Sequence, residues 1–341
     1  MLKNHIVLVG ILLMLGMPLL LSGISQGSLL FLTFEPGARA NGMGRSYTAI
    51  ADDAYGMWWN PGATAFNRKA QLAGTHIPWM AGSGLDDMFY EYLGWNQYFY
   101  GIGNLNAHVV WLDAGTQMAT DTNGDPEGEF HSFDVAGAFG YSYEVLPEKI
   151  GVGGNFKLIY SYLAPGVTIT EQEGSAFTFG FDVGAKFKDV GTKNLDLGVV
   201  LQHIGPDVTF VDQSQADAAP MTFRAGVAYT ILDDQMGKLL VTADASKILA
   251  NEDGLFERFV TGWKHFDETI YGGGTEYTYL QLISLRGGYY YDKAGEITGF
   301  TFGGGVQYKF DNRYKLTADF SMVPGGGLVD YNKLFSLGFE F

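Results

Sequence analysis

The sequence contains no cysteine and few charged residues. Without cysteine there are no disulfide bonds, thiolate metal ligands or lipoprotein acylation site, so any membrane attachment must come from the fold itself. Lysine and arginine number 21 against 37 acidic residues, and the formal net charge is −16. This balance argues against nucleic acid as a partner, because its binding requires clustered positive charge. Charged residues form only 17% of the chain, too few for a soluble acidic protein of two domains.

Long hydrophobic runs are also scarce, and the one present lies at the N-terminus. Residues 6–21 are almost entirely apolar, follow a polar start that contains Lys3, and precede the small residues Gly23 and Ser25. This arrangement predicts a signal peptide over residues 1–25, cleaved after Ser25. The alternative is a retained anchor helix, but a spanning helix needs about 20 apolar residues. The chain is therefore expected to be exported.

The remaining sequence alternates between apolar and polar residues. In residues 130–145, Phe133, Val135 and Phe139 share one face of an extended strand, and small or polar residues share the other. About fourteen segments show this pattern, and most are long enough to cross a bilayer as tilted strands. They are residues 70–80, 88–99, 103–113, 130–144, 149–162, 175–188, 194–204, 221–232, 237–247, 269–279, 281–291, 297–310, 313–322 and 333–341.

The connections between these segments alternate between long and short. The long ones are residues 114–129, 163–174, 205–220, 248–268 and 323–332. Transmembrane barrels have short periplasmic turns and long external loops, whereas a soluble β-sandwich has no reason to sort its loops in this way. The last segment is amphipathic and closes on Phe341, as in many outer-membrane proteins. The predicted fold class is all-β: a transmembrane antiparallel β-barrel of about fourteen strands over residues 69–341, in the outer membrane of a Gram-negative-type bacterium.

Residues 26–68 do not follow the alternating pattern, and we call them the hatch segment. A barrel near fourteen strands is too wide for its own side chains to fill, so its lumen must hold water, a ligand or a plug. Two roles remain open: a movable hatch that gates a pathway, and a static plug that fills the lumen. The residues expected to serve either role are Pro36, Gly37, Arg39, Gly42, Met43, Gly44, Asp52, Asp53, Asn60 and Pro61.

The residue types in the hatch segment each have a physical reason. Its glycines, Gly37, Gly42 and Gly44, allow the backbone to approach the wall closely or to adopt positive φ. Arg39 and the acid pair are expected to bond to a polar lumen rather than to face lipid. The run from Asn60 to Gly62 predicts a turn.

The stretch from Gly42 to Pro61, GMGRSYTAIADDAYGMWWNP, resembles the N-terminal hatch of the FadL-type long-chain fatty-acid transporters. It is more similar still to the PorV/PorQ group of that superfamily, whose members open with a PGARA-x-GMG…ADDA…NP consensus. Residues 204–224, 244–249 and 285–290 are similar to later PorV segments in the same order. One departure is that Gly62 and Thr64 stand where many relatives read NPAGLA.

The resemblance implies a fourteen-stranded outer-membrane barrel of type IX secretion. Its implied partners are the type IX translocon and the C-terminal signal domains of exported cargo, which PorV-like proteins pass to an attachment complex. The external loops 114–129, 205–220 and 248–268 would contact the exported protein. The alternative is a FadL-like channel for long-chain fatty acids or another hydrophobic small molecule, in which the hatch segment moves. Outer-membrane lipid surrounds the barrel in either case.

No cofactor, metal or catalytic site is expected. Residues 121–127 begin like a calcium loop, but Pro126 stands where that loop needs glycine, which favours a solvated acidic loop. Among the histidines only His131 adjoins a serine, and neighbours on a strand point apart rather than towards each other. The protein is therefore not expected to be an enzyme.

Overall fold

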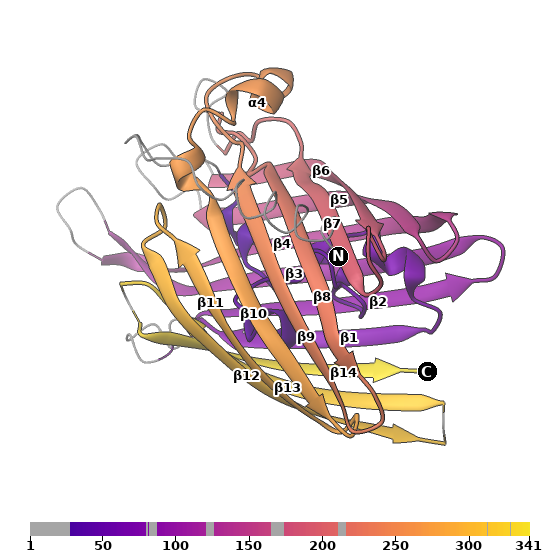
Figure 1. Ribbon diagram of the computed structural model, residues 1–341. Coiled ribbons are helices and arrows are strands. Elements are labelled where there is room, and N and C mark those ends of the chain that lie inside the picture. Colours follow the sequence, from indigo (N-terminus) through magenta and orange to yellow (C-terminus); the bar gives the residue numbers. More distant parts are fainter. Residues whose placement is uncertain are drawn as a thin grey trace.

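Fourteen strands form one closed antiparallel barrel in the computed structural model of the chain (Figure 1). The structure describes residues 28–79, 81, 87–120, 126–164, 174–210, 216–311, 313–327 and 329–341. The strands are β1 (Gln71–Pro78), β2 (Phe89–Phe99), β3 (Gly103–Thr120), β4 (Pro126–Leu146), β5 (Ile150–Ala164), β6 (Gly174–Phe187), β7 (Leu195–Ile204), β8 (Thr222–Asp233), β9 (Gly237–Ile248), β10 (Ile270–Tyr279), β11 (Ile283–Asp292), β12 (Ile297–Phe310), β13 (Tyr314–Pro324) and β14 (Tyr331–Glu340).

The barrel closes because the first strand pairs with the last. β1 and β14 run antiparallel from Gln71 opposite Glu340 to His76 opposite Phe335. Closure gives the backbone N–H and C=O groups partners within the wall, which hydrocarbon requires because it offers none. The predicted barrel of fourteen strands is confirmed.

One predicted loop is wrong. Residues 114–129 were expected to be a long connection, whereas β3 continues to Thr120 and β4 begins at Pro126. The register of this pair shifts between Asp113 and Thr116, and Gly115 adopts a φ of +73° there. A bulge of this kind adds a residue and reverses the alternation, which hides the continuation of the strand from a pattern of period two. Of the candidate calcium loop, residues 121–127, the first five lie outside the described residues and the last two begin β4.

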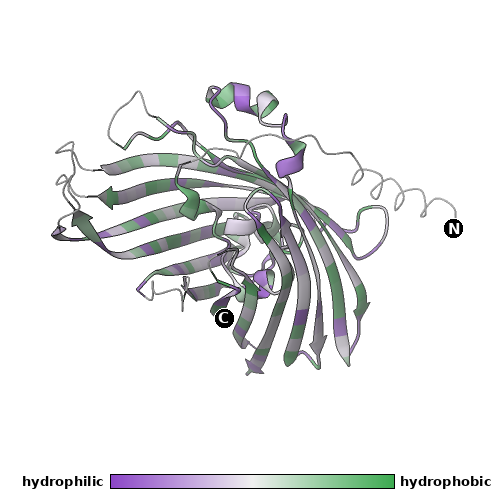
Figure 2. Cartoon of the chain, turned by 90° about the vertical axis from the view of Figure 1, so that its left-hand side faces the viewer, coloured by the Kyte–Doolittle hydropathy of each residue, from purple (hydrophilic) through white to green (hydrophobic). Residues whose placement is uncertain are grey.

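The hatch segment lies inside the barrel. It holds four short helical turns, η1 (Leu30–Thr33), α2 (Ala38–Asn41), α3 (Gly56–Trp59) and η2 (Ala63–Phe66), and Figure 2 shows helical turns within the ring of strands. Trp58 and Trp59 are almost completely buried at its centre. Turn α2 packs against β12, β13 and β14, and η2 packs against β4 and β5. The lumen is therefore filled by a small core. The predicted signal peptide lies outside the described residues.

The hatch segment runs from one end of the barrel to the other. At the end with the long loops, the Ser28 N–H donates to the Ala218 carbonyl at 2.9 Å. At the opposite end, the Phe341 N–H donates to the Ala70 carbonyl at 2.9 Å, next to the start of β1. In an outer-membrane barrel the long loops face outward and the short turns face the periplasm. Residue 28 therefore lies at the outer face.

The longest connection carries a helix that the sequence pattern did not predict. Between β9 and β10, α4 (Leu255–Thr261) and the turn η4 (Phe266–Glu268) stand above the outer end of the barrel (Figure 1). Among the helices in the described residues, none is long and apolar enough to cross a membrane.

The position of residue 28 predicts that the N-terminus expected from cleavage after Ser25 is displayed on the cell surface. A short epitope tag inserted after Gln26 should bind antibody on intact cells, because Ser28 lies beside Ala218 of an outer loop. A matched tag at Gly101, in the short turn between β2 and β3, should bind antibody only after the outer membrane is permeabilised. An N-terminal tag that also requires permeabilisation would contradict this orientation.

Candidate functional site

The hatch segment approaches the barrel wall so closely that several of its positions admit only glycine. Gly44 has a φ of +70°, and a Cβ added to it would lie 2.4 Å from the Gly273 carbonyl oxygen. A Cβ on Gly62 would lie 2.5 Å from the Gly184 carbonyl oxygen. At both contacts the wall residue is also glycine. Backbone therefore meets backbone, which only residues without a side chain allow.

The other glycines of the motif are less crowded, although Gly37 has a φ of +93°. A Cβ on Gly37 would touch the Tyr55 ring at 3.2 Å, and one on Gly42 would lie 3.1 Å from the Gly303 Cα atom. Met43 between them is fully buried. The close-approach role predicted from the sequence is carried mainly by Gly44.

Asp244 of β9 fixes the backbone that follows Gly44. Its carboxylate accepts hydrogen bonds from the N–H groups of Tyr47 and Thr48, both at 2.9 Å. It also accepts from the Ser46 hydroxyl at 2.9 Å and from the Thr48 hydroxyl at 2.6 Å. No role was predicted for Asp244 from the sequence. The sequence feature that could have indicated one is an acidic residue on the polar face of an amphipathic strand.

Arg39 joins the hatch segment to β10 through a bidentate ion pair with Glu276. Its Nε and Nη2 atoms donate to the two carboxylate oxygens of Glu276, both at 2.8 Å. Glu276 also accepts from Arg286 of β11 at 2.6 Å, and Arg286 in turn donates to Asp319 of β13 at 2.6 Å. Bidentate arginine–carboxylate pairs are geometrically specific as well as strong. This chain of charges fixes α2 against three strands of the wall.

The acid pair bonds mainly within the hatch segment. The Arg39 Nη1 atom donates to Asp52 Oδ1 at 2.5 Å and to the Tyr47 hydroxyl at 2.7 Å. The Tyr47 hydroxyl donates to Asp53 Oδ2 at 2.6 Å, and the Tyr55 N–H donates to Asp53 Oδ1 at 3.0 Å. Arg39 thus reaches both the wall and the acid pair, whereas the acid pair has one direct bond to the wall, from the Gln71 side-chain amide of β1 to the Asp52 carbonyl at 3.4 Å.

The two acids have opposite shifts in pKa. Burial raises the pKa of Asp53 to about 6, with the Asp52 carboxylate adding to the rise and Arg39 opposing it. Burial also acts to raise the pKa of Asp52, but Arg39 and the more distant Lys238 and Lys186 hold it below its ordinary value. Arg39 therefore stabilises the ionised form of Asp52 enough to outweigh burial, but it does not do so for Asp53.

The predicted turn at Asn60 and Pro61 closes the hatch segment against the opposite wall. The Asn60 side-chain amide donates to the Thr48 carbonyl at 2.9 Å and to the Ala185 carbonyl of β6 at 3.0 Å. Its side-chain oxygen accepts from the Gly62 N–H at 3.0 Å. The carbonyl of Pro36, near the start of the motif, accepts a hydrogen bond from the Trp59 indole N–H at 3.0 Å. The two ends of the motif are therefore tied together.

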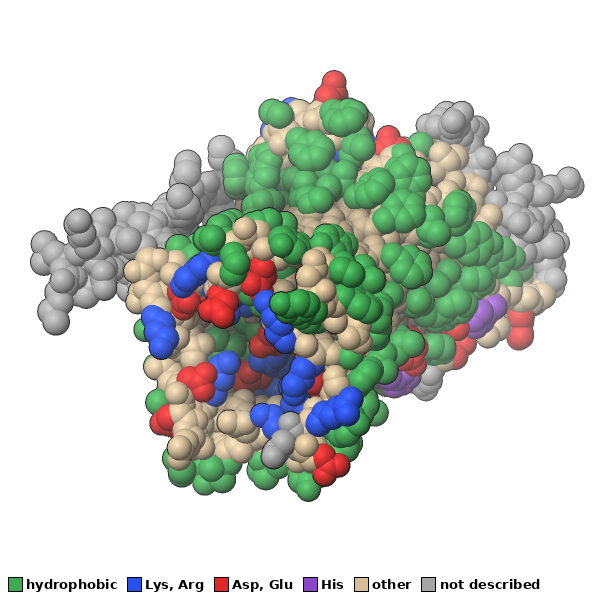
Figure 3. Space-filling view, turned by 90° about the vertical axis from the view of Figure 1, so that its right-hand side faces the viewer, with side chains coloured by type: hydrophobic (Ala, Val, Ile, Leu, Met, Phe, Trp, Pro, Cys, Tyr) green, Lys and Arg blue, Asp and Glu red, His purple; other side chains and the backbone are tan. Residues whose placement is uncertain are grey.

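Separate cavities lie on the two sides of the hatch segment. The periplasmic one has a volume of about 340 Å³ and is lined by Arg39, Asp52, Asp53 and charged residues of the wall. Figure 3 shows this mouth with side chains of both charges inside and hydrophobic ones outside. The outer cavity is smaller, about 170 Å³, and is lined by Glu35 and Arg45 together with apolar residues. Glu35 forms an ion pair with Arg224, in which Oε1 lies 2.6 Å from Nη2.

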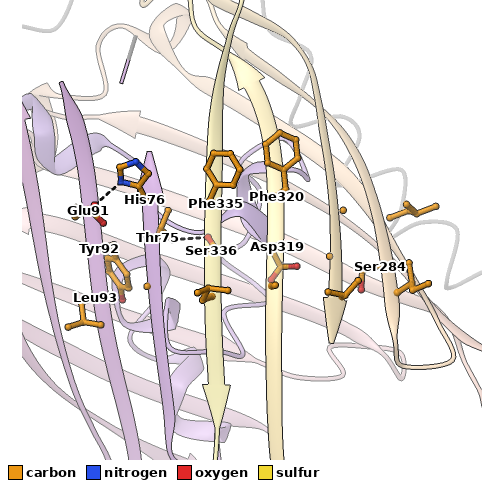
Figure 4. Close-up of a pocket in the computed structure, with 18 of the residues that line it drawn as sticks. Thr75, His76, Glu91, Tyr92, Leu93, Ser284, Asp319, Phe320, Phe335 and Ser336 are labelled. Carbon is orange, nitrogen blue, oxygen red and sulfur yellow. Dashed lines mark hydrogen bonds and ion pairs between the residues drawn. The ribbon is translucent and has the colours of Figure 1, made fainter. Parts of the chain in front are cut away.

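A large apolar concavity indents the lipid-facing wall (Figure 4). Its volume is about 1,070 Å³, and exposed side chains such as Leu93, Phe335 and Leu337 line it. The floor of the concavity lies where the hatch segment bonds to the inner side of the wall. There the Ala38 N–H donates to the Ser336 hydroxyl at 2.8 Å, and the Tyr55 hydroxyl donates to the Gly74 carbonyl at 2.7 Å.

Buried histidines lie in the wall without forming a metal site. His203 contacts a lysine rather than a metal ligand. The Lys157 Nζ atom lies 2.9 Å from His203 Nδ1 and 2.8 Å from Asp182 Oδ2. Across the described ranges, no group of three or more histidine, aspartate or glutamate side chains is placed to hold a metal ion.

A closed fourteen-strand barrel with an N-terminal segment in its lumen defines the class as an outer-membrane β-barrel protein. The family model described as Type IX secretion system protein PorV matches residues 24–253, and the chain belongs to this family. The match includes the opening motif and the first two of the three later resemblances. Residues 285–290 lie beyond it.

Solved structures of similar fold include transporters and channels for hydrocarbons. The toluene transporter TbuX of Ralstonia pickettii is 13% identical, with a TM-score of 0.57 over 89% of this chain and 97% of that one. The toluene transporter TodX of Pseudomonas putida is 13% identical, with a TM-score of 0.55 over 89% and 97%. The monoaromatic hydrocarbon channel CymD is 13% identical, with a TM-score of 0.54 over 92% and 98%. Such identities show the fold alone. No curated protein sequence matches the chain.

Gly44→Ala should loosen the hatch segment. The added Cβ would meet the Gly273 carbonyl oxygen at 2.4 Å while the backbone keeps a positive φ, so the segment must shift. Strain of this kind costs about 1–3 kcal/mol, and we expect a lower temperature for loss of the heat-modifiable, folded band on gels. Gly137→Ala is the control, because a Cβ there meets nothing within 4 Å. Equal melting of the two variants would contradict the proposed close contact.

The shifted acids predict opposite responses to pH. Asp53, with a folded pKa of about 6 against about 4 when unfolded, contributes less stability as pH rises between these values. Asp53→Asn should therefore gain stability relative to wild type between pH 4 and pH 7, measured as the urea midpoint in detergent. Asp52 has a lowered pKa, so Asp52→Asn should lose stability at pH 7, with a smaller loss in acid. Parallel pH profiles for the two variants would contradict this assignment.

Proposed function

We propose that this protein receives the C-terminal signal domains of exported proteins at its outer face and passes them to a surface-attachment complex of type IX secretion. Membership of the PorV family supports this proposal. The lumen supports it as well, because the hatch segment separates cavities of about 340 and 170 Å³, far too small for a protein. The barrel then works as a non-enzymatic receptor, and its hatch segment as a static plug.

The observation that carries the proposal is the apolar face of α4. Phe256 is 85% exposed and Val260 is 76% exposed, and they lie one helical turn apart on α4. Figure 3 shows hydrophobic side chains gathered at the top, where α4 stands. Exposed apolar surface that the fold does not bury marks a site of interaction.

This apolar face is held in place by buried contacts on the other side of α4. Arg258 is 1% exposed, donates from Nε to the Asn251 carbonyl at 3.2 Å, and pairs through Nη2 with Asp207 at 2.6 Å. The Trp263 ring lies 5.1 Å from the ring of Phe223 on β8. The exposed residues are thus presented on a fixed scaffold, which lowers the entropic cost of binding.

The translocon contacts the lipid-facing wall in this proposal. The concavity of about 1,070 Å³ lies across the seam where β1 pairs with β14 and is lined by residues of β1 to β3 and β11 to β14, with apolar residues on its outer side. A hollow of this width fits a convex membrane-embedded surface better than the separate chains of lipids. Ser336, at the floor of this concavity, bonds to Thr75 and to Ala38 of the hatch segment. A partner that binds in the concavity therefore contacts the wall at the residues that hold the hatch segment.

A second candidate is a channel for a hydrophobic small molecule, such as a long-chain fatty acid. The cavity of about 170 Å³ supports it, because apolar residues such as Phe34 and Trp79 line it beside Arg45 and Arg224. In this case the hatch segment would have to move to open a path. Uptake of labelled fatty acid or toluene that is unchanged by deletion of the gene would exclude this candidate.

The receptor function predicts that α4 is required. Phe256→Ser combined with Val260→Ser should weaken binding of a purified signal domain at least about tenfold, because each apolar side chain buried in an interface contributes roughly 1.5–3 kcal/mol. Surface attachment of exported proteins should fall in the same cells. Glu257→Ala, on the polar side of α4, is the matched control and should bind normally. If a deletion strain still secretes and attaches signal-domain proteins at wild-type levels, the proposed function is wrong.

A further inference from the structure

Strand β6 extends beyond its neighbour at the outer rim of the barrel. On one side it pairs with β5 along its whole length, from Gly174 opposite Ala164 to Phe187 opposite Ile150. On the other side it pairs with β7 only from Phe181, which lies opposite the last residue of β7, Ile204. The outer part of β6, residues 174–180, therefore has a strand on one edge only among the described residues.

A buried polar cluster makes β7 end early. The register between β6 and β7 shifts next to His203, whose φ is +58°, and both Gln202 and His203 are buried. The His203 N–H donates to the Asp182 side chain at 2.9 Å. After this bulge the pairing with β6 ends at Ile204, Gly205 lies against the Phe179 carbonyl, and Pro206, which has no N–H to donate, follows.

Among the described residues, the backbone groups on the free edge belong to Ser175 and Phe177, because Gly205 lies against the Phe179 carbonyl. A Cβ built on Gly154 of β5 would lie 3.1 Å from the Asp182 carbonyl oxygen, so that carbonyl points towards β5. A Cβ built on Gly205 would lie 2.6 Å from the Phe179 carbonyl oxygen, so that carbonyl points away from β5. Alternate residues of a strand direct their N–H and C=O groups to the same side. Odd-numbered residues of this part of β6 therefore present donors and acceptors outward along the sheet.

The side chains beside this edge form an apolar ladder. Phe177 is 71% exposed and Phe179 is 45% exposed, whereas Ala176 and Thr178 are buried on the inner face. The ring of Phe156 on β5 lies 6.3 Å from Phe179 and 5.2 Å from Phe181. An edge of this composition is one that natural proteins normally cover or charge, because it invites another strand.

We infer that residues 175–177 of β6 bind an extended strand of the exported signal domain by β-augmentation. This inference rests on the proposed function and specifies how the cargo is held. The added strand lies antiparallel to β6, in line with β7, and occupies the space that β7 leaves. Main-chain hydrogen bonds to Ser175 and Phe177 supply affinity, and apolar side chains of the cargo pack on Phe177 and Phe179.

The test compares Phe177→Pro with Phe177→Ser in the full-length protein, using a purified C-terminal signal domain from an exported protein of the same bacterium. Proline at position 177 removes an N–H that points to the free edge, so the pairing of β6 with β5 is kept. We expect about tenfold weaker binding for Phe177→Pro than for Phe177→Ser, as the loss of main-chain hydrogen bonds predicts. Heat-modifiable migration verifies that each variant is folded.

Phe139→Ser is the matched control. Phe139 is 69% exposed, like Phe177, but it lies on β4, which pairs on both sides with β3 and β5. This variant should bind the signal domain as wild type does. Hydrogen exchange gives an independent readout: the Phe177 amide should exchange fast in the free protein and become protected when the signal domain is bound, whereas the Thr178 amide is protected throughout.

The outcomes separate this inference from the function on which it rests. If Phe177→Pro binds as tightly as Phe177→Ser while the α4 variant is impaired, the receptor function stands and β-augmentation is wrong. If the Phe177 amide is already protected in the free protein, the edge is not available and the inference is wrong. If wild-type protein does not bind the signal domain, the proposed function and this inference both fail.

Discussion

The lumen of a fourteen-stranded barrel is wider than the side chains of its wall can fill, and much of this structure follows from that constraint. The hatch segment fills the space with a core built around Trp58 and Trp59. It is held by backbone contact at Gly44, by the carboxylate of Asp244, and by the Arg39–Glu276 ion pair. These contacts reach strands on several sides, so the plug and the wall support each other.

The same contacts shape the outside of the barrel. Ser336 and Thr75 bond to each other and to the hatch segment on the inner face, while their neighbours Phe335 and His76 line the concavity on the outer face. Side chains alternate across a strand, so each wall position that anchors the plug fixes the adjacent position that faces lipid. The lumen and the membrane-facing surface are therefore not independent in this barrel.

The outer rim differs from the membrane-spanning part because its strands are unequal in length. β3 to β6 continue outward, whereas β7 stops at a bulge centred on His203. Because β7 ends before β6 does, the outer part of β6 has a strand on one side only among the described residues. The loop after β9 carries α4. Both surfaces lie at the end from which cargo would be received, and both offer apolar side chains on fixed backbone. A receptor role needs no opening through the lumen.

The sequence by itself determined the strands, the closure and the family, because a lipid-facing wall imposes strict alternation and the glycine-rich motif lies within the match to the PorV family. It also placed Arg39, Gly44 and Asn60 in the segment that fills the lumen. It missed the outer half of β3, where Gly115 reverses the alternation, and it missed α4 and Asp244. Only the tertiary structure decided which wall residues meet the plug and which edge stays free, because pairing partners and bulges depend on contacts between distant residues.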